Sequence, residues 1–148
     1  MSSQPYQKVT VVRPYDEAIR RRVFGILEQA GLSIGERDII APGVSNEEVL
    51  EQLEWCRDHT LLIPFHAHRD ESGKSLNGVS LYREVRDRWP HLRDNPVLMP
   101  VEDASANVVR KLLEIQGSGR VLVISANELD DPDAVAERVR DHVASSAR

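Results

Sequence analysis

TLLIPF, residues 60–65, is the stretch of sequence that decides the fold. It is short and almost entirely apolar, and Pro64 belongs at its end because proline cannot donate a hydrogen bond to a neighbouring strand. A continuous apolar run of this length is typical of a parallel strand that is buried on both faces. We therefore predict that residues 60–65 form a central strand in a sheet with helices on both sides.

Strand patterns and helix patterns alternate on both sides of this stretch. The other predicted strands are residues 8–13, 32–40, 96–101 and 120–125, of which 32–40 is the weakest and is expected at an edge or as a loop. Residues 66–77 are polar and contain Gly73, so we expect a loop there. Apolar positions at helical spacing predict helices over residues 16–30, 45–57, 78–89, 105–116 and from 132 onward.

This alternation predicts an α/β, flavodoxin-like three-layer fold with a five-stranded parallel sheet in the order 2-1-3-4-5. The residues that we expect to be buried in the sheet are Leu61, Leu62, Ile63, Val97, Leu98, Val121, Leu122 and Val123.

The composition fits a single globular domain over residues 1–148. Apolar residues make up 41% and charged residues 29%, and the net charge of −5 argues against a non-specific nucleic-acid binder, which needs a basic face. No apolar run reaches the roughly 18 to 20 residues that span a bilayer. Residues 1–8 are polar, so we expect a cytoplasmic protein without a membrane partner. The single cysteine, Cys56, excludes an internal disulfide and a multi-cysteine metal site.

In an open parallel sheet, ligands bind outside the carboxyl ends of the strands. The first such segment holds Asp16 and Glu17, whose carboxylates could hold Mg²⁺ together with a third oxygen ligand. Alternatively, Asp16 caps the following helix and Glu17 lies in its first turn, where negative charge is favourable. We favour the capping interpretation.

The sequence FHAHRDES, residues 65–72, is the most chemically suggestive segment. His66, His68 and Asp70 alternate, so in an extended backbone they point the same way, and two imidazoles with one carboxylate suit Zn²⁺. The spacing resembles part of a metallo-β-lactamase-type metal motif, in which a further histidine stands at the position of Glu71 here. We favour a structural role for these histidines, and expect no tightly bound metal, no cofactor, and a segment more mobile than the sheet.

Several local sequences resemble the receiver domains of response regulators, over nearly the whole chain. They are residues 11–20, 45–53, 77–86 and 92–99. The resemblance implies the fold predicted above. It also implies the positions of that family's functional residues, which are an acidic pair after the first strand and a phosphoacceptor aspartate at the end of the third strand.

The functional positions of that family carry other chemistry in this chain. Pro64 and Phe65 stand at the place of the phosphoacceptor aspartate, and neither has an oxygen nucleophile. Arg13 and Pro14 stand where the family has its acidic pair. Pro100 and Val101 stand where it has a Thr or Ser after the fourth strand. Ile124, Ser125 and Ala126 stand where it has a Lys after the fifth strand. The resemblance therefore implies a degenerate receiver, a pseudo-receiver, that signals or acts as a scaffold through protein–protein contacts. It also implies a homodimer through the fourth and fifth helices as one arrangement of the protein.

A second resemblance is to TIR domains, which share the alternating layout. Residues 37–38, 42–43 and Ser45 are similar to the loop between the second strand and second helix of those domains. Some TIR domains hydrolyse NAD with a glutamate on the third helix, which implies that role for Glu84; a solvated surface glutamate is the alternative. We expect a protein without catalytic residues and keep the TIR-like NAD hydrolase as the alternative function.

Overall fold

The main sheet has five parallel strands in the order β2-β1-β3-β6-β7. The computed structural model describes residues 6–12, 17–35, 38–40, 46–65, 68–69, 75–76, 78–101, 110, 112, 115 and 120–146. The five strands are β1 (Lys8–Val12), β2 (Ile39–Ile40), β3 (His59–Leu62), β6 (Val97–Val101) and β7 (Val121–Ser125). Because β6 and β7 are the fourth and fifth strands of this sheet along the chain, the predicted order 2-1-3-4-5 is confirmed.

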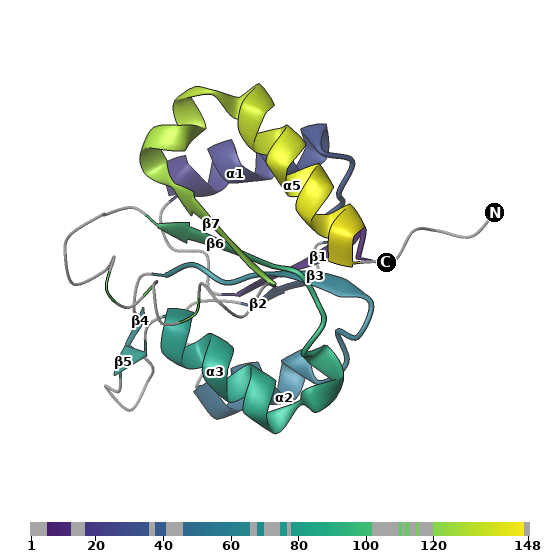
Figure 1. Cartoon of the computed structure of the whole chain (residues 1–148). Helices are drawn as coiled ribbons and strands as arrows, with labels where there is room; N and C mark the ends of the chain where they lie inside the picture. The colour runs from purple at the N-terminus through teal and green to yellow at the C-terminus, as the bar shows by residue number, and fades with distance from the viewer. Residues whose placement is uncertain are drawn as a thin grey trace.

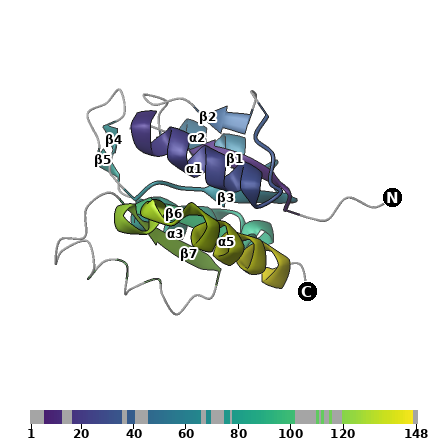
Figure 2. The ribbon, with the colours of Figure 1, turned by 90° about the horizontal axis from the view of Figure 1, so that it is seen from above.

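Helices cover both faces of the sheet, as Figure 1 shows. One layer consists of α1 (Glu17–Gln29) and α5 (Pro132–Ser146), which lie side by side in Figures 1 and 2. The opposite layer contains α2 (Asn46–Leu53) and α3 (Gly78–Arg88). Two short 3₁₀ helices, η2 (Pro90–Leu92) and η3 (Ala126–Asp130), follow α3 and β7. The three-layer α/β architecture is therefore confirmed.

The side chains of β3 divide between the two faces because successive residues of a strand point to opposite sides. Leu61 and Ile63 lie in the core beneath α2 and α3, whereas Leu62 lies in the core beneath α1 and α5. All three are buried, as are Val97 and Leu98 of β6. The continuous apolar run from which the central strand was predicted thus supplies both cores.

The strand at the far edge departs from the expectation. Val121, Leu122 and Val123 of β7 were expected to be buried and are only partly buried. Among the described residues β7 pairs with β6 alone, so one side of the strand has no described neighbouring strand to cover it. An apolar run shows that a segment is a strand, but it does not show whether that strand lies at the centre or at the edge.

Three predicted boundaries also differ from the structure. The segment 66–77, predicted as a loop, contains a small antiparallel pair, β4 (His68–Arg69) and β5 (Ser75–Leu76). Two-residue strands are too short to produce an alternating pattern. The weak strand over 32–40 is confined to β2, with an isolated bridge at Ser33, and it lies at an edge as expected. The second helix ends at Leu53, because tight turns follow it.

Part of the predicted fourth helix lies outside the described residues. Within 105–116 only residues 110, 112 and 115 are described, and all three have helical backbone. Ile115 is buried in the core that α2 and α3 cover. Among the described residues, no helix has the length and apolar content that crossing a membrane requires.

Candidate functional site

The carboxyl end of β3 is where the family resemblance would put a phosphoacceptor. The strand pairing continues beyond Leu62, because Ile63 N–H donates to Leu98 O at 2.9 Å and Phe65 N–H donates to Pro100 O at 3.0 Å. The Phe65 side chain is only 5% exposed and belongs to the core under α2 and α3. The end of this strand therefore presents a buried aromatic ring.

The start of α3 closes against the same strand end. Gly78 N–H donates to Phe65 O at 2.8 Å, and a Cβ at residue 78 would stand 2.5 Å from Pro64 O and 2.9 Å from Phe65 Cα. There is no room for a side chain between α3 and β3 at this point. The predicted helix start at Gly78 is confirmed, whereas this close approach of α3 to β3 was not predicted.

The end of β7 is built as a helix cap. Ser125 N–H donates to Glu128 Oε2 at 2.8 Å in a capping box, and Arg138 of α5 forms an ion pair with Glu128. Burial of the Glu128 carboxyl opposes ionisation, but the hydrogen bonds from Ser125 and Arg138 hold its pKa below the ordinary value. A serine with a capping role thus lies at the strand end where the family resemblance calls for a lysine.

The metal candidates are not brought together among the described residues. His66 and Asp70 lie outside them, and only the backbone of His68, in β4, is described. Asp16 also lies outside the described residues, and Glu17 is the first residue of α1. Within the part of the chain that the structure describes, no three His, Cys, Asp or Glu side chains are placed to share a metal ion.

Glu84, the residue that the TIR resemblance singled out, lies on an exposed position of α3. A catalytic carboxylate needs a substrate held against it. We therefore expect the purified chain to leave NAD unhydrolysed in a fluorescence or chromatographic assay, with no difference between wild type and Glu84→Ala. NAD turnover that disappears in Glu84→Ala would contradict this.

A buried polar cluster occupies the amino edge of the sheet, opposite the edge where a site was expected. Thr10 Oγ1 lies 2.7 Å from His59 Nδ1 and 3.4 Å from Cys56 Sγ. Burial raises the pKa of the Cys56 thiol, against a smaller opposing effect of its contact with Thr10. Cys56 is therefore a neutral, buried thiol at neutral pH.

Asn95 completes this cluster. It is buried, and its Nδ2 amide donates to the carbonyl oxygens of Cys56, Arg57 and His59 at 2.8–2.9 Å. One side chain thereby holds the turn that leads from α2 into β3. Sequence reasoning missed this role, because Asn95 precedes Pro96 and an Asn-Pro pair is an ordinary turn signal.

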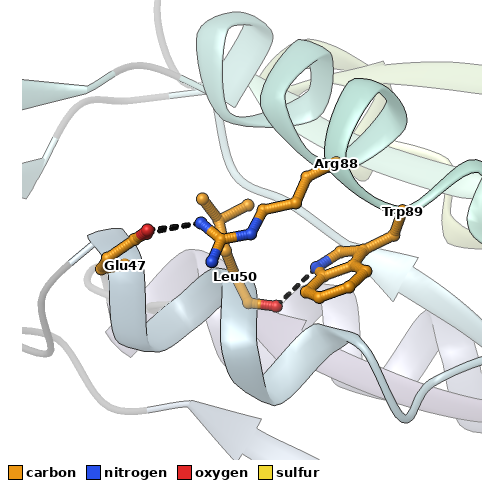
Figure 3. Close-up of polar contacts among 4 residues, drawn as sticks. All are labelled: Glu47, Leu50, Arg88 and Trp89. Carbon is orange, nitrogen blue, oxygen red and sulfur yellow. Dashed lines mark hydrogen bonds and ion pairs between the residues drawn. The ribbon is translucent and has the colours of Figure 1, made fainter.

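The carboxyl end of α3 is fastened to α2 (Figure 3). The Trp89 indole N–H donates to Leu50 O at 2.7 Å, and Arg88 forms an ion pair with Glu47. The Arg88 guanidinium also lies 5.5 Å from the centre of the Trp89 ring. The pair with Arg88 lowers the pKa of the exposed Glu47 carboxyl. These contacts fix the relative position of the two helices.

Two of the hollows on the surface are lined by described residues. One, of about 320 Å³, lies at the ends of α2 and η2 and is lined by Glu54, Trp55, Arg57 and His91. The other, of similar volume, lies beside the edge strand β2. It is lined by Phe24, Glu28, Leu32, Ser33, Ile34 and Ile39.

Comparison with protein-family models gave no match, and no curated protein matched. Solved structures do match over nearly the full length. A CheY-like response regulator receiver domain from Methanospirillum hungatei is 18% identical, with a TM-score of 0.61, and 95% of this chain covers 96% of that one. The signal receiver domain of an HD domain-containing protein from Pseudomonas fluorescens is 12% identical, with a TM-score of 0.66 and coverage of 99% and 92%.

A putative pilus assembly-related protein from Burkholderia pseudomallei is also similar. It is 12% identical, with a TM-score of 0.61, and all of this chain covers 97% of that one. Identities this low establish the fold and leave the chemistry to the residues of this chain. The strand order, the covering of both faces and these structural matches together show that the chain has the CheY-like, flavodoxin-like fold of response-regulator receiver domains.

Proposed function

We propose that this chain is a pseudo-receiver, a phosphorylation-independent signalling or scaffold protein that acts through protein–protein contacts. The observation that carries the proposal is the end of β3, where Phe65 is buried in the core and Pro64 lies against Gly78. Aspartyl phosphorylation requires a carboxylate oxygen that can attack a phosphoryl group. Neither side chain at this place offers one.

The neighbouring strand ends support the same proposal. β6 ends in Pro100 and Val101, both buried, so no hydroxyl is available there to contact a phosphoryl group. At the end of β7, Ser125 is engaged in the capping box of η3. A receiver-like fold with these residues can still bind partner proteins through its surface, but it lacks the residues that respond to phosphorylation. The net charge of −5 favours a protein partner over a nucleic acid.

A small phosphodonor provides the test. We expect no change in intact mass when the chain is incubated with acetyl phosphate and Mg²⁺, because no aspartate stands at the strand end. A phosphorylatable receiver domain treated in parallel shows that the reagent is active. A gain of one phosphoryl group that is labile to acid and to hydroxylamine would contradict the proposal, and peptide mapping would then locate the modified carboxylate.

A further inference from the structure

Trp55 stands out on the surface of the described residues because its large side chain is 81% exposed. Within the described residues its indole N–H has no hydrogen-bond partner. Trp89, by contrast, has its N–H bonded to Leu50 O and its ring beside Arg88. Tryptophan is enriched at protein interfaces because it combines a large apolar area with one donor. An exposed, unengaged Trp55 beside a hollow therefore has the properties of an interface residue.

The His91 side of the hollow beside Trp55 is held in place. His91 Nε2 donates to Glu54 O at 2.8 Å, which fastens η2 to the turn after α2. The His91 ring lies 5.9 Å from that of Trp89, which is itself held to α2. A volume of about 320 Å³ is enough for one aromatic side chain. The surface is therefore formed before any partner binds, which lowers the entropic cost of binding.

The charges around Trp55 are opposite in sign on its two sides. Glu54 precedes it and Arg57 follows it, and both line the hollow. Among the described residues neither side chain forms an ion pair. A patch that carries one charge of each sign favours neither a strongly acidic nor a strongly basic partner. It is complementary to itself when rotated by a two-fold axis.

We propose that this surface binds a second copy of the chain about a two-fold axis. Trp55 of each copy enters the hollow of the other, and Glu54 of each copy meets Arg57 of the other. This is a different surface from the fourth and fifth helices, and self-association here is independent of phosphorylation. Each tryptophan buries roughly 150–250 Å². The contact therefore belongs to the small interfaces, below about 1,200 Å², and the dimer is a weak one.

Sedimentation equilibrium of the full chain, from about 10 μM to about 1 mM, tests the proposal in the range where weak dimers dissociate. We expect a monomer–dimer equilibrium that Trp55→Ala weakens about ten-fold or more. The thermal melt of this variant should match wild type, because the replaced side chain is exposed. A chain that stays monomeric throughout, or a dimer that Trp55→Ala leaves unchanged, would overturn the proposal.

Charge exchange across the two-fold axis gives the sharper experiment. Arg57→Glu and Glu54→Arg should each abolish self-association, because each places like charges opposite one another in both halves of the contact. An equimolar mixture of the two variants should associate again, since every pair across the axis is then of opposite sign. The double variant should also dimerise by itself. Glu137→Arg on α5 makes the same charge change on an exposed position and should have no effect.

Failure of the mixture to associate would show that Glu54 and Arg57 do not face each other, and the proposed arrangement would be wrong. Loss of the dimer in Glu137→Arg, with Trp55→Ala unaffected, would place the interface on α5 instead. Neither result bears on whether the chain accepts a phosphoryl group, so the two proposals fail separately.

Discussion

Gly78→Ala is expected to lower the free energy of unfolding by about 3 kcal/mol, a large loss for a chain of this size. The new Cβ would lie 2.5 Å from Pro64 O and 2.9 Å from Phe65 Cα, and both are backbone atoms that cannot rotate away. α3 would have to move off the end of β3. That movement would stretch the 2.8 Å hydrogen bond from Gly78 N–H to Phe65 O. Urea unfolding followed by circular dichroism measures the effect.

The chain offers a matched control in Gly25. It lies on an exposed position in α1, and a Cβ there would meet nothing within 4 Å. Gly25→Ala should therefore stabilise the protein by about 0.5–1 kcal/mol, because alanine loses less backbone entropy in a helix than glycine does. Equal effects of the two substitutions, in either direction, would show that the contact between α3 and β3 is looser than described.

The sheet could be predicted because its information is local. The apolar run at residues 60–65 identifies a strand buried on both faces, and the structure divides Leu61 and Leu62 between two cores accordingly. The features that could not be predicted depend on which other segments lie beside a strand in the fold. The β7 residues have the same apolar character, yet they are only partly buried because the strand lies at an edge. β4 and β5 are too short for any periodic pattern to reveal them.

Among the functional candidates, too, some features could be predicted from the sequence and others could not. The loss of the phosphoacceptor could be recognised from Pro64 and Phe65, since the chemistry depends on residue type alone. Gly78 and Trp55 could not be interpreted from sequence. The tight contact of Gly78 and the unengaged exposure of Trp55 both depend on which segments the fold brings together. A glycine as the first residue of an amphipathic helix is the one local sign at residue 78, and it fits an ordinary helix start equally well.

Asn95→Asp is expected to cost about 3–5 kcal/mol of stability at neutral pH, although the two side chains have nearly the same shape. The Asn95 amide is 2% exposed and donates to three carbonyl oxygens, those of Cys56, Arg57 and His59. An ionised carboxylate has no proton to donate. It would direct negative charge at three carbonyl oxygens that are buried or partly buried, and the turn between α2 and β3 would lose its connection to β6.

The pH dependence separates this mechanism from a simple packing defect. Burial next to three carbonyl oxygens should raise the folded-state pKa of the introduced carboxyl above its unfolded value of about 3.9. Between those two pKa values the folded state binds more protons than the unfolded state, so stability falls as pH rises. The difference from wild type should therefore be smallest near pH 4 and grow toward neutral pH, as urea titrations at several pH values would show.

The neighbouring exposed Asp94, 4.0 Å from Arg120, provides the control, because Asp94→Asn should change stability by less than about 0.5 kcal/mol. A loss in Asn95→Asp that does not vary with pH would mean that lost packing, rather than the buried charge, destabilises the turn.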